Sequence, residues 1–142
     1  MKKKINKMKK VSALLIIGMF FIFGCQQKST NSNEFIIGSW NYIYNSSRQD
    51  YSLTLELVDD TLKGSHCFVA NNGNKIDCAE ESDFTITCKK RNDNFTGKFH
   101  STYTNNNYNI TLEFINDTLV LSLDNYSDLF FSKELKFIKA KN

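Results

Sequence analysis

The feature that most constrains the fold is the alternation of apolar and polar residues on both sides of short turn sequences. In residues 51–68, YSLTLELVDDTLKGSHCF, a two-residue turn at Asp59-Asp60 places Leu57 opposite Leu62. The same register pairs Leu55 with Gly64, Leu53 with His66, and Tyr51 with Phe68. Because neighbouring side chains of a strand point to opposite faces, this hairpin collects nearly all its apolar groups on one face.

The same alternation flanks other turn sequences along the chain. Turns are expected at Asn72-Gly73, at residues 90–93 and 104–107, and at Asn116-Asp117, with a longer loop at 45–50. The resulting pairs are Tyr44 with Tyr51, Trp40 with Leu55, Ile86 with Gly97, Phe84 with Phe99, Tyr103 with Tyr108, and Phe114 with Leu119. No long window after the N-terminal segment keeps a helical period, so the chain is expected to be all-β.

Together these segments predict eight strands joined in order, each with one apolar face. The last strand presents Leu135 and Phe137. An up-and-down meander of this kind buries its apolar face by closing into an eight-stranded antiparallel barrel, which leaves no open edge. A flattened sandwich of two four-stranded sheets is the main alternative.

The first 24 residues differ from the rest. Residues 1–10 contain six lysines, and residues 11–24 contain no charged side chain. A basic segment followed by a short apolar one predicts a secretory signal peptide, expected as an N-terminal helix, because a membrane span needs about 20 apolar residues. An uncleaved N-terminal anchor helix is the alternative.

The apolar segment ends in Ile22-Phe23-Gly24-Cys25, which resembles the lipobox of bacterial lipoproteins. The resemblance implies cleavage before Cys25, a lipid on its thiol, and acylation of the new N-terminus by a fatty acid such as palmitate. Such acyl chains make a membrane the first expected partner. We therefore expect a lipoprotein signal peptide at 1–24, a flexible tether at 25–34 and a single β-barrel domain at 35–142.

Removal of the signal peptide changes the charge of the chain. Six of the 18 basic side chains and none of the 15 acidic ones precede Cys25, which leaves 12 against 15 and a net charge of −3. A nucleic-acid-binding domain needs a basic face, so nucleic acid is not an expected partner. The expected location is the cell envelope. In a Gram-negative host, Gln26 in place of an acidic retention signal favours the periplasmic face of the outer membrane.

Gly38-Ser39-Trp40 lies on the first expected strand. A G-x-W sequence at this position, followed by an up-and-down meander of eight strands, resembles the lipocalin-like barrels, particularly short bacterial lipoproteins of that type. The resemblance implies a closed barrel. That family often packs an arginine near the C-terminus across the tryptophan, whereas the last strand of this chain offers only lysines.

Three cysteines follow the one in the lipobox, in an exported chain for which disulfides are expected. A type I′ turn centred on Asn72-Gly73 places Cys67 opposite Cys78, as a hydrogen-bonded pair with Cα atoms about 5.5 Å apart, within reach of a disulfide. Cys88 is expected level with Leu62, buried and free. Other pairings stay open, but a zinc site or a redox pair lacks its usual spacing of ligands or thiols.

The hairpin that carries Cys67 and Cys78 is out of phase with the rest of the barrel. Both cysteines, Val69 and Ile76 point outward if the first turn sets the inner face. We therefore expect the hairpin tip to project as a stapled flap. Residues 80–83, EESD, are expected to reset the phase through a bulge or crossing loop.

The chain offers few groups suited to catalysis. His66 is expected inside and His100 outside, so they are not expected to share a site, and an inward histidine among aromatics is usually a satisfied core residue. The acidic residues at 77–83 lack the ligand order of a calcium loop and are expected to be solvated. The motifs of common hydrolases and nucleotide-binding proteins are absent. We therefore expect no enzyme, no cofactor and no metal.

Aromatic residues are expected at many inward positions, and an eight-stranded interior is just wide enough for side chains to fill it. The alternative is a small apolar pocket near one mouth of the barrel, lined by Tyr44, Tyr51, His66 and Phe68. The function predicted first is thus a membrane-anchored, non-enzymatic lipoprotein that binds a small apolar ligand or acts as a binding module.

A protein-interaction module of the envelope is the alternative function. Small exported β-barrel lipoproteins that inhibit lysozyme are similar in anchor, size and use of a disulfide. On that reading the acidic loop at 77–83 would contact a basic enzyme, although the chain contains no recognisable inhibitor motif.

Overall fold

The computed structural model describes residues 35–80 and 82–141. The expected signal peptide, the tether and the lipidation site Cys25 lie outside these residues. Within them, no helix is long and apolar enough to cross a membrane. The described residues form nine strands: β1 (Gly38–Tyr42), β2 (Gln49–Val58), β3 (Thr61–Ala70), β4 (Lys75–Cys78), β5 (Ile86–Arg91), β6 (Asn94–Ser101), β7 (Asn106–Ile115), β8 (Thr118–Leu123) and β9 (Glu134–Lys139).

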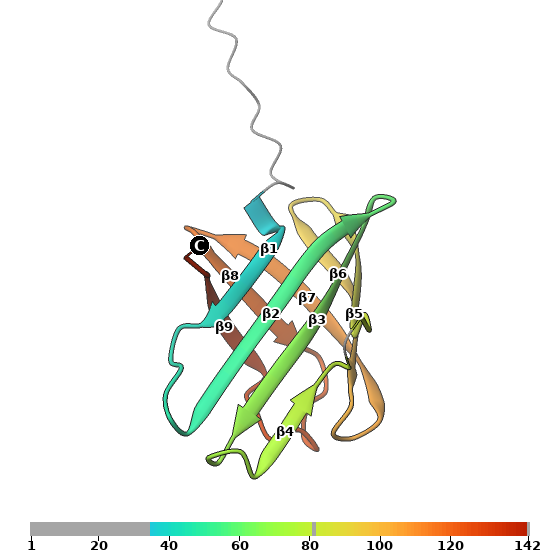
Figure 1. Ribbon diagram of the computed structural model, residues 1–142. Coiled ribbons are helices and arrows are strands. Elements are labelled where there is room, and N and C mark those ends of the chain that lie inside the picture. The colour runs from blue at the N-terminus through green and yellow to red at the C-terminus, as the bar shows by residue number, and fades with distance from the viewer. Residues whose placement is uncertain (1–34, 81, 142) are drawn as a thin grey trace, which may run out of the picture. The chain divides into compact units, whose positions relative to one another are not determined.

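Eight of the nine described strands close into one antiparallel barrel (Figure 1). β1 pairs with both β2 and β9, β2 also pairs with β3, and the wall continues through β5, β6, β7 and β8. The ring therefore has no free end, which confirms the all-β, eight-stranded antiparallel barrel and excludes the flattened sandwich.

β4 is an additional strand on one side of β3. Residues 61–64 of β3 pair with β5, and residues 67–70 pair with β4, so both partners share the same side of β3. Figure 1 shows β4 beside the half of β3 that β5 does not cover. The wall of the barrel therefore changes from β5 to β4 along β3, where Thr85 bonds to Gly64 and Ala79 bonds to His66.

Two turns have the registers that the sequence predicts. Asp59-Asp60 and Asn116-Asp117 both adopt left-handed backbone conformations, with φ between 47° and 62°. Such conformations define a type I′ turn, whose twist matches that of the adjoining strands. Leu57 therefore pairs with Leu62 as expected, and the pairs further along both hairpins are also confirmed.

The register of β5 and β6 differs from the expected one by two residues. The turn contains only Asn92-Asp93 and not residues 90–93, so Ile86 pairs with Phe99. Gly97 lies instead at a close crossing, where an added Cβ would be 2.0 Å from the carbonyl oxygen of Thr87. A side chain at position 97 would therefore not fit in this register, and glycine does.

Two further registers differ from the expected ones, by two residues for β1 with β2 and by four for β6 with β7. Trp40 pairs with Leu53 and not with Leu55, and Tyr108 pairs with Phe99 and not with Tyr103. A shift by an even number of residues keeps every side chain of a strand on its face of the sheet.

Three aromatic residues expected inside lie outside the strands. Tyr44 follows β1 and is 66% exposed, Phe84 precedes β5 and is 47% exposed, and Tyr103 follows β6 and is 48% exposed. These predictions were wrong for the same reason, because each expected strand was extended beyond the last residue that pairs with a neighbouring strand.

The barrel interior is occupied by packed aromatic rings. The largest buried side chains include those of Trp40, Tyr51, Phe68, Phe99 and Phe137. Phe131, from the connection between β8 and β9, inserts among them, with its ring centroid 4.9 Å from that of Phe68 and 6.0 Å from that of Phe99. The last strand contributes Leu135 and Phe137 to this core, as predicted.

Candidate functional site

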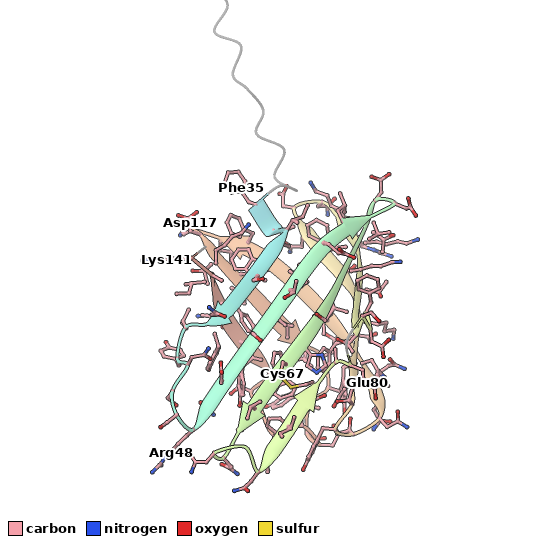
Figure 2. The ribbon with its side chains drawn as sticks, viewed as in Figure 1. Phe35, Arg48, Cys67, Glu80, Asp117 and Lys141 are labelled. Atoms are coloured by element: carbon pink, nitrogen blue, oxygen red, sulfur yellow. A yellow bond between two sulfur atoms is a disulfide. The ribbon has the colours of Figure 1, made fainter. Side chains whose placement is uncertain are left out.

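The two ends of the barrel are built differently. We call the end that carries the turns 59–60, 92–93 and 116–117 the tight-turn end, and the end that carries segments 43–48, 71–74, 102–105 and 124–133 the long-loop end. Figure 2 shows Phe35, Asp117 and Lys141 at the first end and Arg48 at the second. The long-loop end is the candidate functional site, because it holds the disulfide hairpin and the polar clusters described below.

The tight-turn end is closed by a contact around Trp40. The Lys139 Nζ lies 5.2 Å from the Trp40 ring centroid and donates hydrogen bonds to the carbonyl oxygens of Phe35 and Ile37. One of the lysines of the last strand thus packs across the Trp40 ring. Gly38 permits this contact, because its φ of 119° strains any other residue and its missing Cβ leaves room for the lysine stem.

The disulfide between Cys67 and Cys78 is present, as predicted. The Ala79 N–H donates to the His66 carbonyl at 2.8 Å, so the neighbouring cysteines form a non-hydrogen-bonded pair, with Cα atoms 3.9 Å apart. The expectation of a hydrogen-bonded pair was therefore wrong. Cys88 is free, buried and level with Leu62, as expected, and burial raises the pKa of its thiol to about 12.

The turn of this hairpin is longer than the expected two residues. Asn71, Asn72 and Gly73 all adopt left-handed conformations, and the pairing of β3 with β4 ends at Ala70 and Lys75. The register is unchanged, because the four-residue loop has the same centre as the predicted turn.

Asp77 is completely buried and not solvated as the sequence analysis expected. Its carboxylate accepts hydrogen bonds from the His66 ring at 2.9 Å and from the Ser101 hydroxyl at 2.5 Å. It also accepts from the Thr102 N–H and hydroxyl and from the Tyr103 N–H. Burial acts to raise the pKa of Asp77, but these donors outweigh it and lower the pKa to about 2.

The Asp77 network joins parts of the chain that are far apart in sequence. His66 on β3 contacts Asp77 through one ring nitrogen and the Thr85 hydroxyl, at 2.7 Å, through the other. Ser101 and Thr102 lie 24 and 25 residues beyond Asp77. The network therefore ties β3, β4 and the start of the 102–105 loop together where the barrel wall changes from β5 to β4.

Thr85, His66 and Asp77 form a hydroxyl–imidazole–carboxylate series. This combination of groups activates nucleophiles in enzymes, but a nucleophile must be reachable by its substrate. Thr85 is only 6% exposed, and the carboxylate oxygens of Asp77 already accept hydrogen bonds from several donors. The arrangement can brace the fold. It is not open to a dissolved substrate.

His100 does not join this network. Its ring contacts the Asn107 side chain at 3.3 Å on the outer face of the barrel. The prediction that the two histidines do not share a site is confirmed, as is the satisfied inward position of His66. Among residues 35–80 and 82–141, no group of three or more His, Cys, Asp or Glu side chains could hold a metal ion.

Three of the four residues predicted to line an apolar pocket lie together. The Phe68 ring centroid is 5.1 Å from that of Tyr51 and 4.9 Å from that of His66, and all three residues are buried. Tyr44 lies apart from them, 66% exposed, with its ring against that of Tyr42. The apolar pocket itself stays a prediction.

The exposed surface of the long-loop end carries several aromatic side chains. Tyr44, Tyr103 and Tyr126 are all at least 40% exposed. The Tyr103 ring lies 5.1 Å from that of Phe130, and the Lys75 ammonium lies 5.9 Å from the Phe130 ring. This surface and the role of Asp77 were not found by sequence reasoning. Counting from the hairpin centre does place Asp77 opposite Phe68 and therefore inside, which is the signal that was available.

Comparison with known proteins does not assign the chain to a group: no protein-family model matches it, and neither a curated protein nor a solved structure is significantly similar. The site must therefore be interpreted from its own geometry. That geometry is a rigid barrel with one end built from long loops, braced by a disulfide and a buried carboxylate.

Proposed function

We propose that this protein is a lipid-anchored, non-enzymatic binding protein of the cell envelope that contacts a protein partner through its long-loop end. The anchor rests on the lipobox-like sequence at 22–25 and its Cys25. The binding role rests on one contrast in the structure. The barrel interior is occupied by aromatic side chains, whereas the long-loop end exposes aromatic side chains on braced loops.

The braced loops support binding at this end because a rigid surface loses little conformational entropy when it binds. The disulfide and the Asp77 network restrain the 71–74 hairpin and the 102–105 loop. Tyrosine and arginine are enriched in protein interfaces. Tyr44 and Arg48 are exposed on the 43–48 segment and Tyr103 on the 102–105 segment, both at the long-loop end.

The position of Phe35 supports the same assignment. The described chain begins at the tight-turn end (Figure 2). A tether of residues 26–34 connects that end to the proposed lipid, and nine residues extend to at most about 30 Å. The long-loop end therefore lies opposite the attachment point. In a Gram-negative host, we propose that the protein is held at the periplasmic face of the outer membrane.

Site-specific photocrosslinking in the native envelope tests the proposal. A photoreactive phenylalanine analogue replaces Tyr103 at the long-loop end or Ile115 at the tight-turn end, which are 48% and 50% exposed. We expect an adduct of one defined mass from position 103 and none from position 115. Adducts from both positions, or from position 115 alone, would contradict binding through the long-loop end.

Lysozyme is the specific partner to test first. Asp77 cannot contact a basic enzyme because it is buried, which leaves Glu80 and Asp83 as the acidic groups of that loop that the structure describes. Inhibition that is lost when both become alanine supports a lysozyme-inhibitor role. Full lysozyme activity in excess protein argues against it and leaves other protein partners.

A small apolar ligand is the second candidate, and the Tyr51 hydroxyl favours it. This hydroxyl is buried and, among the described residues, makes no hydrogen bond of standard geometry, although Gln49 lies close enough to oppose the rise in the pKa of Tyr51 that burial causes. A ligand that displaced the Phe131 ring would gain both an apolar site and this hydroxyl. Native mass spectrometry of protein purified from its own envelope tests this candidate by detecting a retained small molecule.

A further inference from the structure

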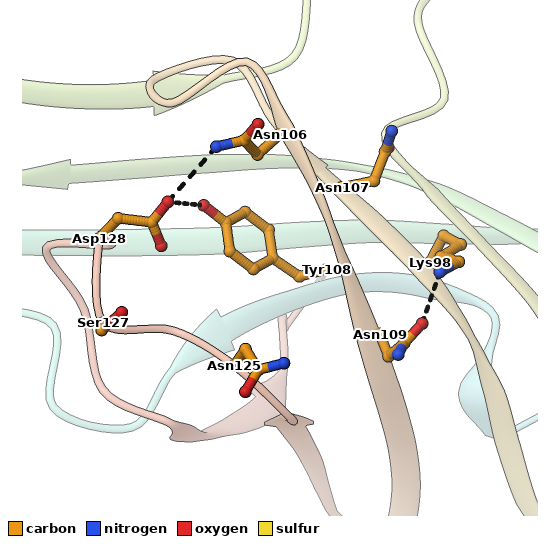
Figure 3. A pocket seen from close by; sticks show the side chains of 8 residues that line it. All are labelled: Lys98, Asn106, Asn107, Tyr108, Asn109, Asn125, Ser127 and Asp128. Atoms are coloured by element: carbon orange, nitrogen blue, oxygen red, sulfur yellow. Dashed lines mark hydrogen bonds between the residues drawn. The ribbon is translucent and has the colours of Figure 1, made fainter.

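A polar hollow lies on the outer side of the barrel at the long-loop end (Figure 3). It has a volume of about 420 Å³, within the range of ligand-binding pockets. Its lining residues are Lys98, Asn106, Asn107, Tyr108, Asn109, Asn125, Ser127 and Asp128. It is therefore formed by β6, the start of β7 and the segment that follows β8.

The hollow exists because β8 does not cover the first residues of β7. β7 begins at Asn106, but its pairing with β8 reaches only to Ile110. The last backbone hydrogen bond between the two segments runs from the Asp124 N–H to the Asn109 carbonyl, at 3.1 Å. In an antiparallel strand, the backbone N–H and C=O groups of every second residue point to the same edge of the strand. Those of Asn107 therefore point to the same edge of β7 as those of Asn109. Residues 125–128 turn away from it, so polar backbone and side-chain groups line the space between them.

The side chains around the hollow are held in place by the protein. The Lys98 ammonium donates to the Asn109 side-chain oxygen at 2.5 Å. The Tyr108 hydroxyl donates to Asp128 Oδ2 at 2.7 Å, and the Asn106 amide donates to the same oxygen at 3.4 Å. The hydrogen bond from Tyr108 lowers the pKa of Asp128, so this carboxylate is ionised at neutral pH.

These contacts leave both donors and acceptors for a ligand. The hydrogen bond from Lys98 uses the side-chain oxygen of Asn109 and leaves its amide nitrogen available as a donor. The hydrogen bonds from Asn106 and Tyr108 both use Oδ2 of Asp128 and leave Oδ1 available as an acceptor. Asn125 and Ser127 add an amide and a hydroxyl, and Figure 3 shows them across the hollow from Asn109 and Asn107. Within the described residues, the hollow thus offers alternating donors and acceptors over a short distance.

We propose that this hollow is a binding site for a neutral saccharide. Adjacent hydroxyls of a sugar ring each donate and accept, which matches side-chain amides, a hydroxyl and a carboxylate. The single positive charge of Lys98 is balanced by Asp128, so the site favours neither an anion such as phosphate nor a cation. Apart from Tyr108, which is only 6% exposed, the described lining residues are polar or charged, and this disfavours a hydrophobic peptide side chain. This inference does not depend on the lipid anchor or on a protein partner.

Calorimetric titration of the purified full-length protein tests the inference. The protein is kept in a zwitterionic detergent without a sugar headgroup, and the probes are tri-N-acetylchitotriose, maltotriose and inorganic phosphate. We expect saturable binding of at least one of the two saccharides and none of phosphate. No saturable binding of either saccharide, or binding of phosphate alone, would overturn the proposal.

Matched asparagine variants locate the binding. Asn109→Ala and Asn125→Ala each remove an amide from the hollow, and Asn41→Ala removes an equally exposed amide from the outer face of β1. We expect at least a tenfold loss of saccharide affinity in the first two variants and no change in the third, with unchanged thermal unfolding in all three. Equal affinity in all three variants would overturn the assignment to this hollow.

Discussion

The two ends of the barrel differ in how their connections between strands are stabilised. At the tight-turn end, the two-residue turns at 59–60 and 116–117 have both residues in left-handed conformations. At the long-loop end, Asp77 contacts residues 101–103, and Tyr108 contacts Asp128, 20 residues away. The turns of the first end need only local contacts, although Lys139 also bonds there to the distant Phe35 and Ile37, whereas the loops of the second end depend on contacts that exist only after the barrel closes.

This difference separates a structural end from a candidate binding end. Two-residue turns leave little surface that can vary without changing the register. Long loops leave surface available for recognition. Because loops lack the hydrogen bonds that join strands in a sheet, other contacts must hold them in place. The disulfide and Asp77 supply those contacts, and the proposed protein surface and saccharide site both lie on the same end.

Removal of the buried Asp77 carboxylate should lower the stability of the long-loop end more than any other change considered. Asp77→Ala leaves the His66 ring, the Ser101 hydroxyl and the Thr102 N–H without their acceptor in a buried region. We expect a loss of about 3–5 kcal/mol in the free energy of unfolding, measured by urea denaturation. Asp83→Ala, at an exposed carboxylate six residues further on, serves as the control and should change stability by less than about 0.5 kcal/mol. Similar losses in both variants would show that the network is not a brace.

Removal of the disulfide should have the next largest effect. The bridge joins residues 11 apart in sequence, and a loop of that length is expected to contribute about 3 kcal/mol. The double variant Cys67→Ala/Cys78→Ala should lose that much stability, and amide hydrogen exchange should rise at β4 more than at the tight-turn end. Cys88→Ala keeps the bridge and is the control for loss of a cysteine. Uniform exchange changes over the whole barrel would argue against a local brace.

Acid should weaken the long-loop end through Asp77. Its pKa is lowered from 3.8 to about 2 in the folded state, so the ionised carboxylate favours folding. This contribution is complete above about pH 4 and is lost as the pH falls toward 2, a loss of about 2 kcal/mol. The difference in unfolding free energy between the protein and Asp77→Asn, measured against pH, should shrink over that window. A difference that stays constant from pH 5 to about 2 would contradict the role of this carboxylate.

A turn substitution at the other end should have the smallest effect of the four. Asn116 has a φ of 47°, a conformation that costs most residues with a Cβ about 1–2 kcal/mol. Asn116→Ala should therefore lower stability by about 1 kcal/mol, whereas Asn116→Gly should be nearly neutral in thermal unfolding. Neither change should alter photocrosslinking at position 103. Loss of crosslinking in the alanine variant would mean that the two ends are coupled.

Much of the fold follows from local pattern. Asp59-Asp60 and Asn116-Asp117 each permit one turn geometry, so the pairs around them are predicted correctly. The same counting from Asn72-Gly73 predicts the disulfide even though the turn itself is longer, because both loops have the same centre. The inward position of His66 and the free, buried state of Cys88 follow from these registers.

Other registers do not follow from pattern, because a shift of two residues leaves every side chain on its original face. Apolar alternation therefore cannot separate a turn at 90–93 from one at Asn92-Asp93. The two are told apart only in the assembled sheet, where Cys88 pairs with Gly97 and the Thr87 carbonyl approaches Gly97 closely.

The sequence by itself determined the all-β class, the meander of eight strands, the disulfide pair and the expectation of a lipid on Cys25, because these depend on residues near each other in the chain. Only the tertiary structure decided that Asp77 is a buried brace, that Phe131 fills the barrel, and that a polar hollow opens beside β7. Each of these depends on residues about 20 or more positions apart. Their meeting is set by barrel closure, which no local pattern encodes.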